Sequence, residues 1–264
     1  MLVHPQFDPI IFQLGPLAVR WYGLMYLCGF AAFWYLGTKR AQKPGSFIHP
    51  DQVSDFLFYA VLGVIVGGRI GSVLFYNLDH FLANPVYLFK IWEGGMSFHG
   101  GLVGVLTVIW LYQKKRNWGF FRLADFIAPL VPPGLGFGRI GNFINGELWG
   151  RPTDVGWGMI FPQVDNLARH PSQLYQVMLE GLVMFLILWF YSAKPRATGS
   201  VSGWFLILYG TFRFIVEFAR EPDEHLGFIA FNWLTMGQLL SLPMIAAGVL
   251  LLWLANKNVF EKNT

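Results

Sequence analysis

Charged residues are scarce in this sequence. Asp, Glu, Lys and Arg make up 13% of the 264 residues, whereas 55% are hydrophobic and the mean hydropathy is +0.46. A soluble domain usually carries about twice that share of charge. The composition therefore excludes a soluble fold and indicates that lipid is the main solvent of the chain.

Cysteine and metal-binding patterns are also lacking. Cys28 is the sole cysteine, which excludes an intramolecular disulfide, and its place inside an apolar run indicates a packing role. The protease motifs HExxH and GxSxG are absent. The six histidines are dispersed without the spacing of metal ligands: His4, His49, His80, His99, His170 and His225. We therefore predict no metal site and no cofactor.

Long apolar runs dominate what is present. The first follows a start, MLVHPQFDPI, with no basic segment or early cleavage motif, so we expect no removable signal peptide. Crossing a bilayer takes about 20 helical residues. Suitable runs recur about seven times, at 16–37, 54–76, 97–113, 123–143, 172–191, 202–218 and 233–255. The sequence predicts an all-α integral membrane protein of about seven transmembrane helices, forming a single polytopic domain over residues 1–264.

Basic clusters predict the orientation of these spans. Eleven of the nineteen Lys and Arg residues fall on one side of the predicted topology: Lys39, Arg40, Lys43, Lys114, Lys115, Arg116, Arg122, Lys194, Arg196, Lys257 and Lys262. Cytoplasmic loops carry such an excess. We expect the amino terminus outside, the carboxyl terminus in the cytoplasm, and arm and loop segments over the outer face at about 77–96, 144–171 and 219–232. Because the net charge of +4 mostly reflects these clusters, it does not indicate nucleic-acid binding.

Polar groups inside the predicted spans gather at one depth. An ionisable side chain in a span costs roughly 2.5 to 3.5 kcal/mol, so it requires a partner, a wet cavity or a function. The groups near the outer ends of five spans are Arg20 and Tyr22, Arg69, Ser97 and His99, Arg139 and Asn142, and Arg213 and Glu217. Their coincidence predicts a functional site near the outer surface.

Each residue taken singly has a structural alternative. Arg20 and Arg220 fit interfacial residues that reach to headgroups, and Tyr22 fits an aromatic belt. Arg213 and Glu217 are spaced as an i, i+4 ion pair, and His99 alone fits a polar packing residue. We interpret Glu180, nearer mid-membrane, and Asp125, near the cytoplasmic end, as structural.

Glycines mark two further features. Gly63, Gly67 and Gly71 in one span, with Gly100 and Gly104 in another, predict close helix packing. Residues 132–146, PPGLGFGRIGNFING, predict a weakly specified, broken helix.

The motif GRIG occurs twice, at 68–71 and 138–141, and each copy follows an Asp-Phe pair by the same interval. We therefore hypothesise a parallel repeat in which Arg69 and Arg139 are equivalent.

The arginines suit a phosphate. Guanidinium offers paired, charge-assisted donors, and neighbouring glycines let a headgroup approach. No GK[ST] follows GRIG, so it is not a P-loop. At outer-headgroup depth the expected anion is a phospholipid head, with Arg69, Arg139 and Arg213 as candidate ligands.

Five segments carry a resemblance to a known family: RWYGLMY (20–26), GGMSFHGGLVG (94–104), GRIGNFINGELWGR (138–151), RHPSQLYQ (169–176) and YGTFRFIVEFAR (209–220). Together they closely resemble bacterial phosphatidylglycerol:prolipoprotein diacylglyceryl transferase. The resemblance implies a multi-pass enzyme of the bacterial inner membrane, with its site toward the extracytoplasmic side. Its partners would be phosphatidylglycerol, as membrane lipid, and the lipobox cysteine of a preprolipoprotein signal peptide. Matching positions imply important residues at Tyr22, His99, Arg139, Asn142, Glu147, Gly150, Arg213 and Glu217.

The chemistry of the candidate site residues fits the diacylglyceryl transfer that the resemblance implies. A thiol has a pKa near 8.5, so its attack on a glycerol carbon requires a base or an electrostatic field that favours the thiolate, and His99 is the candidate base. Arg139 and Arg213 would stabilise the departing phosphate, and Glu217 would orient Arg213. Asn142 and Glu147 would hold the headgroup or Arg139, and Tyr22 would donate to a phosphate oxygen. The predicted phospholipid-binding set is Arg69, Gly100, Gly101, Arg139, Gly150, Tyr209, Arg213 and Arg220.

An anion transporter or channel is the main alternative, because intramembrane arginines and broken helices also serve permeation. A through-path would need polar residues in the inner half of the membrane. Residues 24–36 and 103–111 are almost wholly apolar there. The sequence therefore favours a one-sided pocket.

Overall fold

The chain forms two compact units. The computed structural model describes residues 2–15, 17–90, 94–222 and 227–260. Unit 1 comprises Met1–Phe33 with Asp125–Asn263, and unit 2 comprises Trp34–Ala124. Helices α1 (Trp21–Ala41) and α5 (Phe120–Ile127) run across the unit boundaries.

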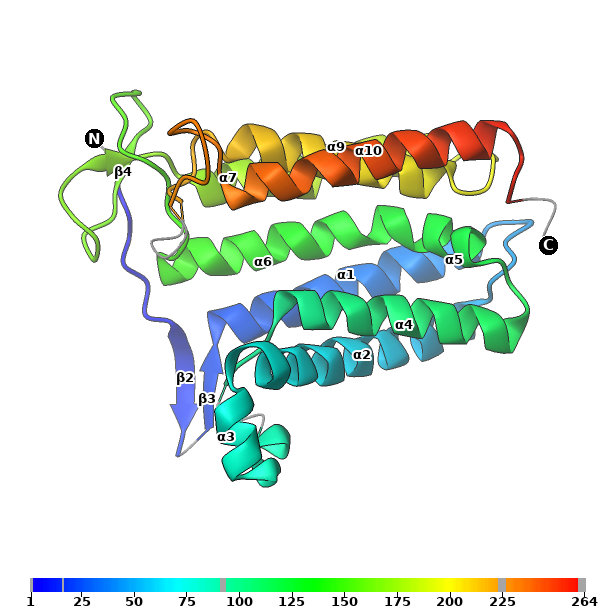
Figure 1. Ribbon diagram of the computed structural model, residues 1–264, viewed down its shortest axis with the longest axis horizontal. Helices are drawn as coiled ribbons and strands as arrows, with labels where there is room; N and C mark the ends of the chain where they lie inside the picture. Colours follow the sequence, from blue (N-terminus) through cyan, green and yellow to red (C-terminus); the bar gives the residue numbers. More distant parts are fainter. Residues whose placement is uncertain (1, 16, 91–93, 223–226, 261–264) are drawn as a thin grey trace. The chain divides into compact units, whose positions relative to one another are not determined.

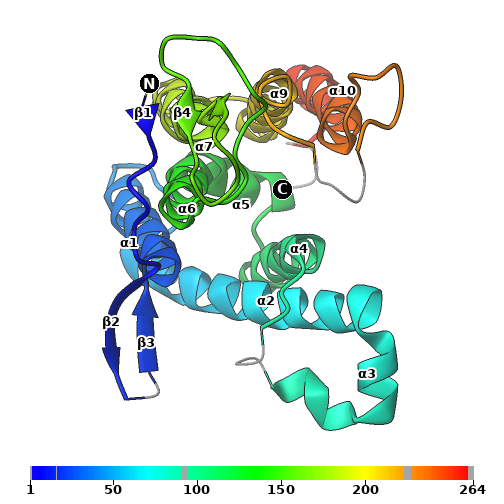
Figure 2. The same ribbon diagram turned by 90° about the vertical axis from the view of Figure 1, so that its left-hand side faces the viewer.

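Unit 1 is a helical bundle. After the short η3 (Ala128–Leu130) come α6 (Val131–Asn145), α7 (Ser172–Gln176), the π-helix η4 (Val177–Val183), α8 (Met184–Tyr191), α9 (Ser200–Val216) and α10 (Met236–Asn256). Helices α9 and α10 lie side by side, and α6 packs along α7 and η4 (Figures 1 and 2). The core consists of Ala128, Met184, Leu188 and Val201. This arrangement directs polar residues of α6, η4 and α9 toward one another.

Helix α6 is continuous, so the predicted break in residues 132–146 is wrong. Its prolines fall in the first turn, where the backbone N–H groups have no acceptor within the helix and proline removes no bond. Gly136 packs against Gly181 of η4, where an added Cβ would lie 3.3 Å from the Gly181 Cα. Gly136 of this helix thus serves contact with η4.

Short strands correct the all-α prediction. β1 (Leu2–Val3) pairs in parallel with β4 (Met159–Ile160), which pairs antiparallel with β5 (Ala168–Arg169). β2 (Ile10–Leu14) and β3 (Leu17–Arg20) form an antiparallel hairpin. The first predicted span, 16–37, therefore begins too early, because the chain is extended up to Arg20 and helical only from Trp21.

Unit 2 is built around two closely packed helices, α2 (Pro50–Tyr76) and α4 (Phe98–Arg116), with α3 (Leu78–Ala83) and the 3-10 helix η1 (Pro85–Phe89) between them in sequence. An added Cβ at Gly63 would lie 2.9 Å from the carbonyl oxygen of Gly104, and one at Gly71 would lie 2.7 Å from the Gly100 Cα. The predicted glycine contact between these two helices is confirmed.

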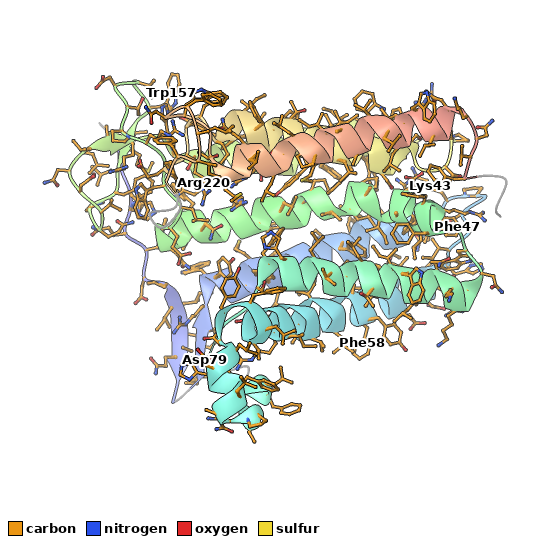
Figure 3. All side chains as sticks on the ribbon, in the orientation of Figure 1. Lys43, Phe47, Phe58, Asp79, Trp157 and Arg220 are labelled. Carbon is orange, nitrogen blue, oxygen red and sulfur yellow. The ribbon has the colours of Figure 1, made fainter. Side chains whose placement is uncertain are left out.

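The helices have the apolar surfaces of a membrane protein. Three helical stretches within the described residues are long and apolar enough to cross a bilayer: α2, Ser172–Tyr191 and α10; α9 is apolar but shorter. Large hydrophobic side chains project from them, such as Phe58 of α2, which is 61% exposed (Figure 3). Helix occurs in all seven predicted regions, and the count of seven crossings stays a prediction.

Candidate active site

Arg139 is paired across two helices of unit 1. Its Nε lies 3.8 Å from Oε2 of Glu180, a carboxylate with no exposed surface. Gln176 Nε2 donates to Glu180 Oε1 at 3.2 Å. A π-helix has a wider turn than an α-helix and commonly marks a functional site, and η4 places Glu180 opposite α6. Glu180, interpreted from sequence as structural, is therefore the carboxylate partner of Arg139.

A second ion cluster forms where α9 ends. Glu217 Oε1 lies 2.5 Å from Nη2 of Arg213 and 3.2 Å from Nη1 of Arg220. The Thr235 hydroxyl donates to Glu217 Oε2 at 2.7 Å. Because these residues follow one another by three or four along the helix end, both guanidiniums reach the same carboxylate. Glu217 is 1% exposed, so this carboxylate is shielded from water.

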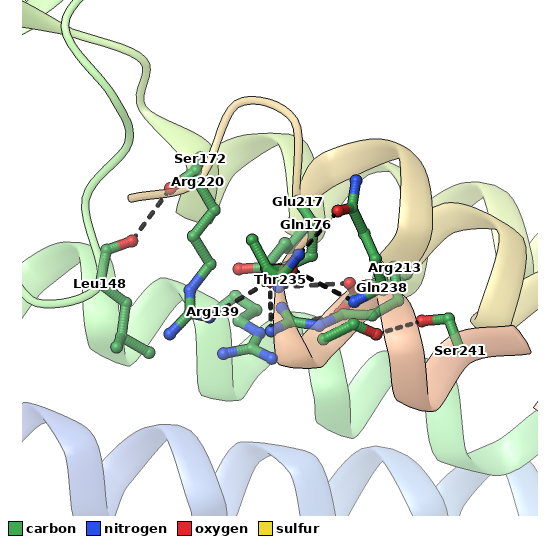
Figure 4. A network of polar contacts seen from close by, with 12 residues as sticks. Arg139, Leu148, Ser172, Gln176, Arg213, Glu217, Arg220, Thr235, Gln238 and Ser241 are labelled. Atoms are coloured by element: carbon green, nitrogen blue, oxygen red, sulfur yellow. Dashed lines mark hydrogen bonds and ion pairs between the residues drawn. The ribbon is translucent and has the colours of Figure 1, made fainter. Parts of the chain in front are cut away.

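The two clusters join into one network. Arg139 interacts electrostatically with Arg213 and Arg220, and Figure 4 shows the three guanidiniums turned toward one another. We call Arg139, Glu180, Arg213, Glu217 and Arg220 the buried charge network. It contains three cations and two anions, and the buried Nη1 of Arg213 donates to no group in the described part of the chain. A buried guanidinium N–H group without an acceptor is costly, so the network suits an anionic ligand.

Tyrosines adjoin the network. The Tyr209 hydroxyl lies close to Arg139. Tyr26, which the sequence prediction missed, also interacts with Arg139, and its ring lies 5.2 Å from that of Tyr22. Tyr22 packs on Gly141, where an added Cβ would lie 2.9 Å from the ring. Tyr22, a site residue predicted from the sequence, therefore adjoins the network indirectly, through its contact with Tyr26.

An open cavity of about 560 Å³ lies at the carboxyl-terminal end of α6, lined by Pro9, Ala18, Arg20, Tyr22, Gly23, Asn145 and Glu147. Asn145 Nδ2 donates to Glu147 Oε1 at 3.1 Å, and Asn142 Nδ2 lies 3.4 Å from Oε2. Asn142 follows Arg139 by one helical turn, so α6 connects the cavity to the buried charge network.

Hydrogen bonds from Arg151 and Arg169 hold the loop that follows α6 in place, and we call these contacts the clamp. Arg151 donates to the carbonyl oxygens of Arg220, at 2.9 Å, and Glu217, at 3.0 Å. Arg169 donates to Asp165, Glu221 and the Gly150 carbonyl. Gly150 lies within this clamp, and an added Cβ there would contact the carbonyl oxygens of His170 and Ala219. The structure thus gives Gly150 a packing role.

Three side chains in this clamp have shifted pKa values. The hydrogen bonds from Arg169 to Asp165 hold the pKa of that carboxyl below its usual value and raise the pKa of Arg169. Burial, followed by the positive charge of Arg151, lowers the pKa of His170. Each shift favours the protonation state in which the clamp is intact.

The predicted site residues of unit 2 have different surroundings. His99 is exposed in the first turn of α4. Gly100 packs against Gly67 and Gly71, and Gly101 lies against Val64.

Arg69 also belongs to unit 2, and it is only 3% exposed. It donates to the carbonyl oxygens of Tyr87, Leu88 and Gly94, and its guanidinium lies 4.5 Å from the centre of the Tyr87 ring. Its described hydrogen bonds are therefore to backbone carbonyl groups, whereas Arg139 pairs with the carboxylate of Glu180. The two GRIG arginines are not equivalent in their contacts.

Asp125, interpreted from sequence as structural, caps the beginning of α9. Its carboxylate accepts from the backbone N–H of Gly199 at 2.6 Å and of Ser202 at 2.8 Å. These bonds satisfy N–H groups that the helix itself leaves unpaired. The structural interpretation of Asp125 is confirmed.

Comparison with known proteins identifies the family. A family model described as prolipoprotein diacylglyceryl transferase matches residues 9–254. Curated relatives named phosphatidylglycerol–prolipoprotein diacylglyceryl transferase include that of Solidesulfovibrio magneticus, 58% identical over 100% of this chain and 99% of its own. The protein of Oleidesulfovibrio alaskensis is 58% identical over 98% and 97%, and that of Aliivibrio salmonicida 59% over 98% and 92%. The chain therefore belongs to the prolipoprotein diacylglyceryl transferase family.

Proposed function

We propose that this protein transfers the diacylglyceryl group of phosphatidylglycerol to the thiol of the lipobox cysteine in preprolipoproteins. The products are a thioether-linked lipoprotein precursor and glycerol phosphate, and the reaction is the first step of lipoprotein maturation. The names of its relatives supply the substrates. The observation that carries the proposal is the buried charge network, in which arginines of α6 and of the end of α9 converge and the buried Nη1 of Arg213 donates to no group in the described part of the chain.

The reaction is a displacement at carbon. The cysteine sulfur forms a bond to the glycerol carbon that bears the phosphate, and the carbon–oxygen bond breaks with its electrons passing to the phosphate oxygen. Arg139 and Arg213 face the headgroup phosphate and stabilise the charge that develops there, with Arg220 beside them. Glu180 and Glu217 orient the guanidiniums, and Tyr209 adds a hydroxyl near the phosphate.

The remaining site residues have supporting or proton-transfer roles. His99 accepts the proton of the cysteine thiol, since the thiolate is the nucleophile. Tyr22, Asn142 and Glu147 bind the headgroup glycerol in or beside the cavity at the end of α6. We propose that Arg69, Gly100, Gly101 and Gly150 support lipid binding by holding the surrounding loops and helices in place.

The enzyme works within a bilayer. We propose that the two units form one domain with seven membrane crossings, the amino terminus outside and the carboxyl terminus in the cytoplasm. Phosphatidylglycerol enters from the outer leaflet of the bacterial inner membrane, where the signal peptide presents its lipobox. Support comes from the basic clusters on one predicted side and the apolar helix surfaces.

The test is to incubate purified protein with phosphatidylglycerol and a lipobox peptide and measure the peptide mass. We expect the mass to rise by one diacylglyceryl group in thioether linkage. Arg139→Ala should reduce turnover by about 100-fold or more, the usual effect of losing a donor to a developing anion. Arg139→Lys should restore it only in part, because an ammonium lacks the guanidinium fork. His99→Gln should also reduce turnover.

Arg196→Ala is the matched control, because Arg196 is an exposed arginine whose described contacts are with Tyr191. Absence of the modified peptide with folded wild-type protein would refute the proposed function. Normal turnover by Arg139→Lys would refute the role of the fork, and normal turnover by His99→Gln would reassign thiol deprotonation to another group.

A further inference from the structure

The Glu217 carboxylate is held from the side of α10 as well as by arginines. Thr235 is the N-cap residue of α10, and its hydroxyl oxygen accepts from the backbone N–H of Gln238 at 3.3 Å. The same hydroxyl donates its hydrogen to Glu217 Oε2 at 2.7 Å. Thr235 is 3% exposed, so water does not compete for either bond. One side chain thus links the start of α10 to the carboxylate.

Gly237 leaves room for that carboxylate. An added Cβ at this position would lie 2.7 Å from Glu217 Cδ and 2.9 Å from Oε1. Such distances are below van der Waals contact, and Oε1 is the atom that accepts from both Arg213 and Arg220. The first turn of α10 therefore approaches Glu217 more closely than any side chain at this position would permit.

The approach also has an electrostatic consequence. Backbone N–H groups in the first turn of a helix favour a nearby negative charge. With Thr235 bound to one carboxylate oxygen and the arginines bound to the other, Glu217 has a fixed position and a fixed orientation.

We propose that Thr235 and Gly237 are positioning residues for the transferase reaction, which fix Glu217 and through it the guanidiniums of Arg213 and Arg220. The inference rests on the proposed function, because its effect is on the arginines that bind the phospholipid phosphate. It adds a requirement that lies on α10, outside the sequence segments that carried the family resemblance.

A helix cap without a positioning role is the alternative explanation for Thr235, and three substitutions separate the two. Thr235→Ser keeps both the cap and the donated hydrogen bond. Thr235→Asp keeps the cap, because aspartate is an excellent N-cap residue, but replaces the donor with a second carboxylate facing Glu217. Thr235→Val keeps the shape and loses both bonds.

We expect Thr235→Ser to retain most activity. Thr235→Asp and Thr235→Val should lower kcat/KM for phosphatidylglycerol by roughly ten-fold or more, the usual cost of losing a buried hydrogen bond to a charged group. The KM for the lipobox peptide should stay unchanged, because the arginines bind the lipid phosphate. A general loss of structure would alter both constants and lower the unfolding temperature of the purified protein.

Gly237→Ala provides an independent arm. Its added methyl group should displace the Glu217 carboxylate and lower kcat/KM for phosphatidylglycerol in the same way. Gly134→Ala is the control, because Gly134 is also a helical glycine but an added Cβ there meets no atom within 4 Å. If the variants at one of the two positions, 235 or 237, give only unfolded protein, the variants at the other position test the positioning role. The measured constants are again kcat/KM for phosphatidylglycerol and KM for the lipobox peptide.

The outcomes separate this inference from the proposed function. Inactive, folded wild-type protein would overturn the function. Active wild-type protein together with a fully active Thr235→Asp would overturn the role of Thr235 and leave a helix cap only. Equal activity of Gly237→Ala and Gly134→Ala would overturn the role of Gly237.

Discussion

Gly150 occupies a position that has no room for a side chain. An added Cβ would lie 2.6 Å from the Cβ of His170, besides contacting two carbonyl oxygens. The backbone here also donates from Gly150 to His170 and from Arg151 to Ala219, both at 2.9 Å. A methyl group would have to push these segments apart, and the segment at Ala219 lies between Glu217 and Arg220 in the sequence.

We therefore predict that Gly150→Ala destabilises the protein by about 1 to 3 kcal/mol, the range for overpacking a tight site, and reduces transferase activity. Unfolding temperature and turnover of the purified protein would measure both effects. Gly156→Ala, in the same loop, is the control because an added Cβ there meets no atom within 4 Å. Equal stability of the two variants would show that the loop moves aside at no cost.

The predictability of single residues depended on their neighbours in sequence. Arg213 and Glu217 were found because an i, i+4 pair at a helix end is visible in the chain itself. The partner of Glu180 was not found from the sequence because Arg139 lies on another helix. Thr235 and Gly237 gave no signal, since their importance arises only from the approach of α10 to Glu217.

At the scale of elements, the loop between α6 and α7 is stabilised by groups that titrate. The pKa of His170 is lowered from 6.5, chiefly by burial. Its neutral form therefore stabilises the fold above pH 6.5, and this contribution is lost as pH falls below that value toward the folded pKa. The pKa of Asp165 is lowered from 3.8, chiefly by Arg169. Its contribution persists above pH 3.8 and is lost as pH falls further.

We predict that this loop weakens in two steps on acidification, the first below pH 6.5 and the second below pH 3.8. Amide hydrogen exchange over residues 150–170, measured as a function of pH after correction for intrinsic rates, would report both. His170→Gln should abolish the first step alone, and Asp165→Asn the second alone. A single step common to both variants would contradict the assignment.

Helices were predicted better than strands. Apolar runs of about 20 residues identify helices from local sequence, and all seven predicted regions contain one. β1 and β4 were missed because each has two residues and their pairing joins segments more than 150 residues apart. The prolines of α6 led to the wrong prediction of a broken helix. The energetic cost of a proline depends on its position in the helix, and these prolines lie in the first turn.

At the scale of the whole molecule, the family and the membrane character followed from sequence, whereas the number of crossings depends on a bilayer. Three helical stretches have the length and composition of a span. The predicted seven crossings require α1, the helix at 120–145, α4 and α9 to cross too, although some carry charges near their ends. Such charges are tolerated where long side chains reach the membrane surface.

The lone cysteine permits a direct test of this topology. Replacing Cys28 with alanine removes every thiol, so one new cysteine at a time can report its side of the membrane. Exposed positions are available at Leu14 and Asp154, predicted outside, and at Lys115 and Lys194, predicted inside. We expect a membrane-impermeant maleimide to label the first pair in intact spheroplasts and the second only after lysis. Labelling of Lys115 or Lys194 before lysis would contradict the predicted orientation. Labelling of all four on one side would contradict the predicted crossings, because the three spans predicted between Leu14 and Lys115 must place these two positions on opposite faces.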